Sequence, residues 1–299
     1  MLKVGVIGIG KLGSIHLRIY KEIKGIANIY LVDTNETTLK NNNNCPSFKD
    51  YKELKDKVDL VSIATPTTSH FEIAKFFLNH RIPVLVEKPL TQNLKEAEEL
   101  VNLSRKMRTL LFVGHVERYN SAYLAVKEFI KNPLFIECHR LNPYPNRSLD
   151  ISVVLDLMIH DLDIILDLVR DEVKKVQAKG VKVLSASDDI ANVRLEFKKG
   201  CVANITSSRI SAKRERKIRI FMSNLYVSLD YANQEVEIYQ KLGEKIVKKS
   251  LGINKEEPLK KEISEFIKLV KAKKYKTEYA EKAKDALGLA LKIQRNIAK

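Results

Sequence analysis

Three side chains combine the chemistry to move a proton or to stabilise charge on an oxygen atom with a position that suggests a site: Lys88, Asp156 and His160. Lys88 directly follows the apolar run Val84–Val86, within the tripeptide Glu-Lys-Pro. Ligands of open α/β sheets bind outside the carboxyl ends of strands. A lysine at that place can donate to a substrate oxygen and stabilise a developing alkoxide. Taken alone, Glu-Lys-Pro is also typical of a solvated turn.

Asp156 and His160 belong to a polar stripe on a predicted long helix, Ile151–Val169. Asp156, His160, Asp163 and Asp167 are spaced i, i+4, i+7 and i+11, which predicts a single helix face. For Asp163 and Asp167 we expect an ordinary amphipathic surface. For Asp156 and His160 that interpretation competes with a carboxylate–imidazole pair in which the histidine accepts a proton. Metal ligation is a third possibility, but the sequence supplies no clear further ligands, and we expect no metal.

A glycine-rich turn lies between the first apolar run and the first predicted helix. Gly8, Gly10 and Gly13 form G-I-G-K-L-G, in which the glycines permit a tight turn, close approach to a pyrophosphate, and close packing of helix on strand. The helix N-terminus would then face the phosphates. Asp33 ends the second strand, and its carboxylate can accept hydrogen bonds from both ribose hydroxyls but repels a 2′-phosphate. The motif therefore predicts NAD as the cofactor, with NADP the alternative.

The elements that must position these residues fall into two groups. In the first third of the chain, apolar runs alternate with helical patterns, which predicts a parallel sheet with helices on both faces. After about Asn120 we expect a helix at Tyr123–Ile130, a strand at Phe135–Leu141, a loop, and the helix Ile151–Val169. Six or seven short strands between Val173 and Val247 predict an antiparallel meander, and two helices follow. The fold class is therefore α/β: a Rossmann domain over residues 1–118, then an α+β domain over 119–299 whose C-terminal helices can pack back on the first.

Composition excludes several classes of protein. Lys and Arg total 53 against 37 Asp and Glu, a formal charge of +16, which favours anionic partners in general. The basic residues lack interleaved aromatic residues, so we expect no nucleic-acid partner, and we interpret the run Lys213–Arg219 as a solvated strand edge or hairpin. The most apolar long stretch carries five ionisable residues, which predicts no membrane span. Three cysteines without C-x-x-C spacing and no signal-peptide pattern predict a cytoplasmic protein.

Taken together, the motifs resemble those of the Gfo/Idh/MocA family, which is named after glucose–fructose oxidoreductase and inositol dehydrogenase. The resemblance runs nearly end to end and rests on the order and spacing of five motifs: GIGKLGSIH at Gly8–His16, ATPTTSH at Ala64–His70, EKP at Glu87–Pro89, GHVERYN at Gly114–Asn120 and DLMIHDLD at Asp156–Asp163. Met158 stands where the family usually has glycine, a departure that leaves Asp156 and His160 in place.

The resemblance implies a Rossmann domain followed by an open-faced antiparallel sheet that often mediates oligomerisation, and hence a homo-oligomer, either dimer or tetramer. It implies that Lys88, Asp156 and His160 line the active site. The matching cofactor-binding positions are Gly8, Gly10, Lys11, Leu12, Gly13, Asp33, Thr65, Pro66, His70, Glu87 and Lys88.

The stretch Gly114–Arg147 and the last motif look most like the branch that oxidises UDP-N-acetylhexosamines at C3. The implied function is an NAD-dependent sugar dehydrogenase. Candidate substrate contacts are the cationic, aromatic and amide residues Arg118, Tyr119, Asn120, Tyr144 and Arg147, since arginine can bind a pyrophosphate through a two-pronged fork. Arg118 and Arg147 could equally be structural ion-pair partners. The alternatives are a dehydrogenase of free sugars or inositol and a non-catalytic dinucleotide sensor.

Overall fold

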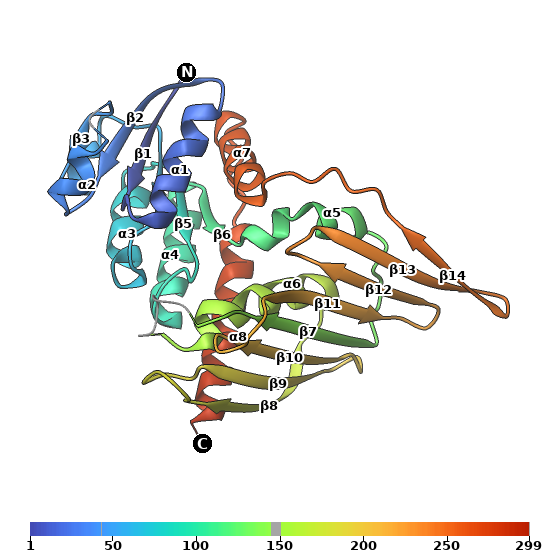
Figure 1. Ribbon diagram of the computed structural model, residues 1–299. Helices are drawn as coiled ribbons and strands as arrows, with labels where there is room; N and C mark the ends of the chain where they lie inside the picture. The colour runs from blue at the N-terminus through green and yellow to red at the C-terminus, as the bar shows by residue number, and fades with distance from the viewer. Residues whose placement is uncertain (43, 145–150, 299) are drawn as a thin grey trace. The chain divides into compact units, whose positions relative to one another are not determined.

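The computed structural model describes residues 1–42, 44–144 and 151–298, and the chain forms two compact units (Figure 1). The first unit comprises Met1–His115 and Leu259–Lys284, and the second comprises Val116–Pro258 and Asp285–Lys299. The division between the domains was expected after residue 118. It falls three residues earlier, because the segment from Val116 onward contacts the second unit. No helix within the described ranges is long and apolar enough to cross a membrane.

The first unit contains a six-stranded sheet in which every neighbouring pair of strands is parallel. Its strand order, β3-β2-β1-β4-β5-β6, reverses direction at β1, as in doubly wound nucleotide-binding folds. This confirms the predicted parallel sheet. The strands are β1 (Leu2–Ile7), β2 (Ile26–Val32), β3 (Ser47–Phe48), β4 (Leu60–Ile63), β5 (Val84–Glu87) and β6 (Leu111–Gly114).

Local sequence signals explain where the helices of this unit begin and end. The predicted helix Asn93–Met107 is confirmed: the Asn93 side chain accepts a hydrogen bond from the Glu96 N–H as its N-cap, and the helix ends at Arg108 in a left-handed conformation. Phe266 of α7 packs on Phe112 of β6, with ring centroids 5.6 Å apart, so this C-terminal helix belongs to the first unit. The helices are α1 (Lys11–Glu22), α2 (Glu36–Lys40), α3 (His70–Asn79), α4 (Leu94–Met107) and α7 (Pro258–Lys271).

The second unit is built on an eight-stranded sheet ordered β14-β13-β12-β11-β7-β10-β9-β8 (Figure 1). The expected meander is wrong at one point, because β7 lies between β10 and β11 and pairs in parallel with β10. All other pairs are antiparallel. The strands are β7 (Phe135–Leu141), β8 (Val173–Val181), β9 (Ile190–Phe197), β10 (Val202–Ser208), β11 (Glu215–Phe221), β12 (Leu225–Asp230), β13 (Glu235–Leu242) and β14 (Lys245–Ser250).

Helices cover one face of this sheet. Alternating residues of β7, β9 and β11 are buried against α5 (Ser121–Val126), α6 (Ile159–Val169) and the C-terminal part of α8 (Glu278–Ile297). The expected regular helix Ile151–Val169 is wrong in its first half, where Val154–Met158 form a π-helical turn before α6 begins. A π turn contains an extra residue, and such turns are frequent at functional sites. Asp156 lies within it, so the 3.6-residue spacing does not describe this part of the stripe.

Candidate active site

The glycine-rich turn of the first unit has the geometry that the motif predicts. Gly8 has φ +83°, a left-handed conformation that favours glycine. A Cβ atom on Gly13 would lie 1.8 Å from the backbone oxygen of Gly8, so helix and strand approach too closely for any side chain. Nothing lies within 4 Å of the corresponding position on Gly10. The helix α1 begins after Gly10 without a side-chain cap, so its first N–H groups remain for an anion.

An added methyl group should have different effects at Gly13 and at Gly10. Gly13→Ala should lower the melting temperature of the apo protein, because a backbone clash must be relieved. Gly10→Ala should leave that temperature unchanged but weaken NADH binding, since its methyl group would occupy the open space in front of the turn. Thermal unfolding and NADH fluorescence titration of both variants check this. An apo protein destabilised equally by both substitutions would contradict it.

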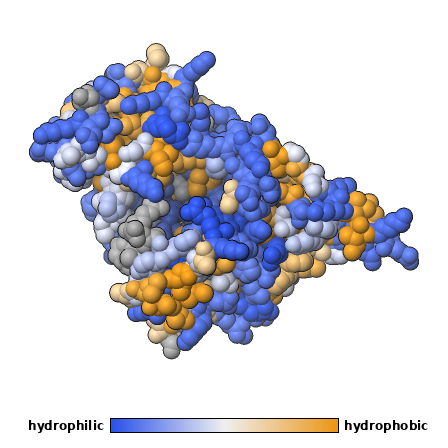
Figure 2. Space-filling view, in the orientation of Figure 1, coloured by the Kyte–Doolittle hydropathy of each residue, from blue (hydrophilic) through white to orange (hydrophobic). Residues whose placement is uncertain are grey.

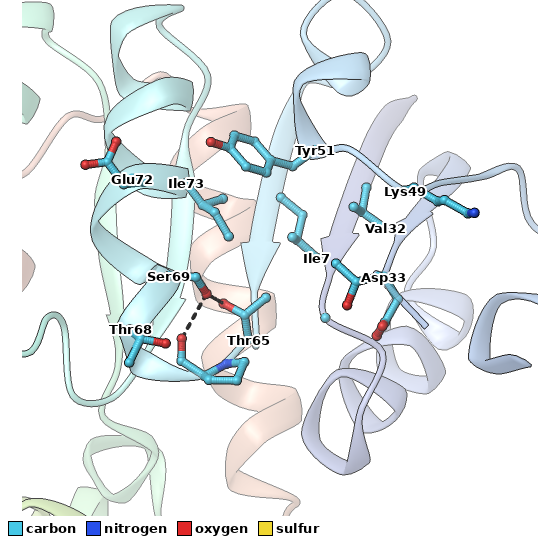
Figure 3. A pocket seen from close by; sticks show the side chains of 13 residues that line it. Ile7, Val32, Asp33, Lys49, Tyr51, Thr65, Thr68, Ser69, Glu72 and Ile73 are labelled. Atoms are coloured by element: carbon cyan, nitrogen blue, oxygen red, sulfur yellow. Dashed lines mark hydrogen bonds between the residues drawn. The ribbon is translucent and has the colours of Figure 1, made fainter. Parts of the chain in front are cut away.

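A pocket of about 470 Å³ opens beside this turn in the first unit (Figure 3). Asp33 borders it, and its carboxylate accepts hydrogen bonds from the N–H groups of Ile9 (2.7 Å) and Asn35 (2.8 Å). Asp33 therefore holds the glycine-rich turn while its remaining lone pairs are available to a ribose. Thr65 and Pro66 form the opposite wall, where the Ser69 hydroxyl donates to Thr65 Oγ1 at 2.8 Å.

Some residues that line this pocket were not predicted from the sequence. Lys49, Tyr51 and Glu72 also line the pocket. No local signal marks these residues, because they reach the pocket from separate segments: Lys49 and Tyr51 follow β3, and Glu72 lies in α3. Three features of this pocket fit a dinucleotide. They are a tight turn that tolerates only glycine, a helix N-terminus without a side-chain cap, and a carboxylate at the position expected for the ribose.

The segment that carries Lys88 is held from within the first unit. Glu87 is only 7% exposed, and its carboxylate accepts a hydrogen bond from His16 Nε2 at 2.9 Å. His16 Nδ1 lies 2.7 Å from the Ser62 hydroxyl. His70 is 1% exposed, and its ring nitrogens lie 3.0 Å from the Pro89 carbonyl oxygen and 2.9 Å from that of Thr65. Glu87 and His70 were predicted to contact the cofactor, and the structure gives both side chains interior partners. Lys88 itself is half-buried.

Asp156 and His160 lie in the second unit, at the π-helical turn and the start of α6. Both side chains are half-buried. Their neighbour Asp161 is fully enclosed. The wider π turn and the α-helical turn that follows thus present one carboxylate and one imidazole that solvent can reach.

Asp163 and Asp167 were expected to form an ordinary amphipathic surface. The structure corrects this expectation, because both side chains are engaged in ion pairs. Asp163 is 1% exposed and accepts two hydrogen bonds from Arg118, from Nε at 2.6 Å and from Nη2 at 2.8 Å. Arg118 Nη1 lies 3.0 Å from Asp167, which also accepts a hydrogen bond from the Tyr123 hydroxyl at 2.6 Å. Burial and the neighbouring Asp167 raise the pKa of Tyr123. The Arg118 guanidinium, a predicted substrate contact, is therefore engaged as an ion-pair partner within its own unit.

A second buried ion cluster lies beneath α6. Arg140 of β7 donates from Nε and Nη2 to Asp161, each at 2.8 Å, and from Nη1 to Glu117 at 2.8 Å. The Tyr231 ring lies against the guanidinium, 5.6 Å from its centroid. Burial raises the pKa of Asp161 even though Arg140 opposes the shift. Sequence reasoning missed this cluster, because one arginine in a strand carries no sign that it points inward.

The remaining predicted substrate contacts differ in their surroundings. Asn120 is buried: its side chain caps α5 by accepting from the Ala122 N–H at 3.1 Å and donates to the Tyr231 carbonyl at 3.0 Å. Tyr119 is half-buried and Tyr144 is 38% exposed. Arg147 lies outside the described residues.

The basic run Lys213–Arg219 largely forms β11, but this strand pairs with β12 on one side and β7 on the other, so it is not the solvated strand edge that was expected. Lys217 lies 3.9 Å from Asp230, and Arg219 lies 2.9 Å from Glu137. Within the described ranges, no group of three or more His, Cys, Asp or Glu residues is arranged to hold a metal ion.

Comparison with known proteins identifies the class to which this fold and these residues belong. Residues 2–115 match the family described as "Oxidoreductase family, NAD-binding Rossmann fold", and residues 128–227 match the "GFO/IDH/MocA C-terminal domain". The chain belongs to the Gfo/Idh/MocA family of oxidoreductases, which confirms the resemblance stated from the motifs.

Among individual relatives, the chain is similar to the UDP-N-acetylglucosamine 3-dehydrogenase of Acidithiobacillus ferrooxidans. The two are 35% identical over 243 residues, which span 80% of this chain and 77% of the relative. A solved structure of that enzyme superimposes with a TM-score of 0.92 at 31% identity and covers 99% of this chain and 97% of its own. The myo-inositol 2-dehydrogenase of Thermotoga maritima is 29% identical over 70% of this chain and 69% of its own length.

Proposed function

We propose that the protein is an NAD-dependent dehydrogenase that oxidises a secondary hydroxyl of a nucleotide sugar, a UDP-N-acetylhexosamine at C3. The observation that carries the proposal is the similarity to a UDP-N-acetylglucosamine 3-dehydrogenase over four-fifths of the chain. The half-buried trio of Lys88, Asp156 and His160 supports it, since these are the residue types that oxidation of an alcohol requires.

In this proposal each residue of the trio has one role. His160 accepts the hydroxyl proton, because an alcohol cannot release hydride efficiently while its proton stays on. Asp156 orients the imidazole or a neighbouring hydroxyl and stabilises the imidazolium. Lys88 donates a hydrogen bond to the same oxygen and stabilises its developing charge. Nicotinamide, when bound, supplies the hydride acceptor.

The residues that would hold the dinucleotide are those of the first unit. Gly8, whose own N–H donates to the Val32 carbonyl, and Gly13 would permit the tight turn, and the backbone N–H groups of Gly10, Lys11 and Leu12 would face the pyrophosphate. Asp33 would bind the adenosine ribose, and Thr65 and Pro66 would line the opposite wall. Glu87 and His70 would act from behind this surface, since their side chains bind interior partners.

The predicted substrate contacts likewise divide into residues that would touch the substrate and residues that would support them from behind. Tyr119 and Tyr144 are proposed to contact the nucleotide sugar directly, together with Arg147. Arg118 and Asn120 would shape the surface from beneath, because Arg118 binds Asp163 and Asn120 caps α5.

A substrate panel tests the proposal. Purified protein is mixed with NAD⁺ and with UDP-N-acetylglucosamine, UDP-N-acetylgalactosamine, glucose or myo-inositol, and nicotinamide absorbance is followed. We expect reduction of NAD⁺ with a UDP-N-acetylhexosamine. The Thermotoga maritima relative favours the second candidate, an inositol dehydrogenase. Turnover of myo-inositol or glucose without any response to the UDP-sugars would support it. NADH binding without turnover of any substrate would indicate a dinucleotide sensor.

The environment of Asp33 predicts that NADH binds more tightly than NADPH. A carboxylate facing a 2′-phosphate is repelled, and Asp33→Ser should reduce the preference roughly tenfold by removing that repulsion. Fluorescence titration of the wild type and of Asp33→Ser with NADH and with NADPH measures this preference. Tighter binding of NADPH by the wild-type protein would show that Asp33 does not face the ribose.

We also propose that the sheet face of the second unit that helices leave uncovered joins copies of the chain into a homo-oligomer. Phe135, Phe221, Tyr226 and Tyr239 follow one another across four adjacent strands of this face, with successive ring centroids 4.7–5.6 Å apart. A groove of about 380 Å³ runs beside them, and Figure 2 shows apolar surface near the β13–β14 hairpin, where Leu242 and Ile246 are exposed. Light scattering on wild type and on Tyr226→Lys measures the mass. A monomeric wild type would contradict the proposal.

A further inference from the structure

We propose that His16 and His70 are positioning residues that together hold the residues on either side of Lys88. Neither histidine has a role in the proton transfer derived above. The inference rests on the proposed function only in that Lys88 is taken to act on the substrate, and its test includes a readout that needs no substrate.

His16 acts on the residue before Lys88. It projects from α1 and is fully buried between β4 and β5, where Nε2 donates to Glu87 at 2.9 Å. A carboxylate only accepts hydrogen bonds, so the proton of this pair is on Nε2. On the other side of Glu87, a Cβ atom on Gly114 would lie 2.9 Å from the carboxylate, which explains why the facing strand carries glycine there. The Glu87 side chain is therefore confined from both directions.

His70 acts on the residue after Lys88. It begins α3 and lies with Nδ1 3.0 Å from the Pro89 carbonyl oxygen. Its Nε2 lies 2.9 Å from the carbonyl oxygen of Thr65, a residue of the pocket wall. Burial lowers the pKa of His70, while the two carbonyl oxygens oppose that shift. A carbonyl oxygen only accepts hydrogen bonds, so a neutral imidazole donates to one of these two oxygens, and we take Nδ1 as the donor to Pro89. The imidazole thus lies between the segment that carries Lys88 and the pocket beside the glycine-rich turn.

Holding the residues before and after Lys88 matters because a lysine side chain by itself does not fix the place of its ammonium group. Its ammonium group ends a flexible four-carbon stem. The residues on either side of Lys88 are held by two buried imidazoles from different helices: His16 contacts the Glu87 carboxylate, and His70 contacts the Pro89 carbonyl oxygen. Misplacement of a catalytic group by about 1 Å can cost on the order of 10²-fold in rate.

Asparagine and glutamine variants separate the contacts, because the amide nitrogen of Asn reaches about as far as Nδ1 and that of Gln about as far as Nε2. His16→Gln keeps a donor for Glu87, whereas His16→Asn can reach only Ser62. His70→Asn keeps a donor for Pro89, whereas His70→Gln can reach only Thr65. Each position therefore supplies its own matched control, with a buried imidazole removed in all four variants.

Two measurements then test the proposal. With UDP-N-acetylglucosamine as the probe, His16→Asn and His70→Gln should lower kcat by roughly 10–100-fold, and the matched variants His16→Gln and His70→Asn should each lose several-fold less than the other variant at the same position. In the background of Lys88→Met, the first two substitutions should have no further effect on kcat, because residues that act through Lys88 are not additive with its loss. Separately, peptide mass spectrometry measures acetylation of Lys88 by an amine-reactive ester. That rate should rise several-fold in His16→Asn and His70→Gln only.

The outcomes distinguish this inference from the proposed function. If wild type does not turn over the probe, the proposed substrate is wrong, and the acetylation rates still decide the positioning role. If Lys88→Met alone leaves kcat unchanged, the catalytic role of Lys88 is wrong. Equal acetylation rates in all four histidine variants would overturn the positioning role itself. So would losses of kcat that track the melting temperatures of the four variants and not the contact each one retains.

Discussion

His160→Asn is expected to lower kcat by roughly 10²–10⁴-fold, the range typical of a positioned general base. The substitution keeps a polar side chain at the start of α6, but an amide cannot accept a proton near neutral pH. NADH affinity should stay near that of the wild type, because the dinucleotide pocket is formed by residues of the first unit. Steady-state kinetics with the substrate found in the panel and an NADH titration measure the two effects.

The pH dependence of kcat gives a second readout of the same variant. A free imidazole has a pKa of about 6.5, so the wild-type rate should fall toward acid pH as the base becomes protonated. The residual rate of His160→Asn should lack that acid limb. His139→Asn, on β7, is the matched control and should behave like the wild type. Turnover by His160→Asn within a few-fold of wild type would make His160 a packing residue and Lys88 the better candidate for proton acceptor.

Arg140→Met is expected to destabilise the second unit by about 3–5 kcal/mol, the usual cost of removing one partner of a buried ion pair. The side chain of Arg140 is 2% exposed and lies between Glu117 and Asp161. Methionine fills much of the same volume but leaves both carboxylates in the interior without their cation. Because Asp161 adjoins His160, activity should fall as well. Urea unfolding followed by circular dichroism measures the loss of stability.

Arg219→Met is the matched control for this variant. Arg219 also pairs with a carboxylate on the same sheet, but both partners are about one-third exposed, so the loss should be about 0–1 kcal/mol. Adding Glu117→Gln and Asp161→Asn to Arg140→Met should recover part of the stability, since no buried charge is then left unpaired. A loss for Arg140→Met no larger than that for Arg219→Met would show that the cluster does not stabilise this unit.

Much of the fold follows from local features of the sequence. The glycine-rich turn, the buried runs of β1, β4 and β5, and the cap at Asn93 all reflect neighbours within a few residues of one another. Such signals predict the class of each element and the parallel sheet. They do not predict which strands become neighbours when the connection is long. The placement of β7 between β10 and β11 depends on pairing across more than sixty residues of chain.

The candidate site divides in the same way. Residue type and position at a strand end marked Lys88 and Asp33 as candidates, and helical spacing marked Asp156 and His160, because both arguments use the chain's own local geometry. Partners distant in the chain were not predictable from the sequence. Arg118 meets Asp163 across 45 residues, and His16 meets Glu87 across 71. The π-helical turn, which packs against β10, was equally hidden, because the spacing of its residues gave no sign of it.

The sequence by itself thus marked the candidate residues for dehydrogenase chemistry and determined which family the chain resembles. Only the tertiary structure decided which charged side chains are enclosed in ion pairs and which stay partly exposed. The physical reason is burial: a charged group can leave water only with a partner, and that partner is chosen by the packing of the whole unit. Asp163 and His160 carry equally polar side chains three residues apart on one helix, yet Asp163 is enclosed with Arg118 while His160 stays half-buried.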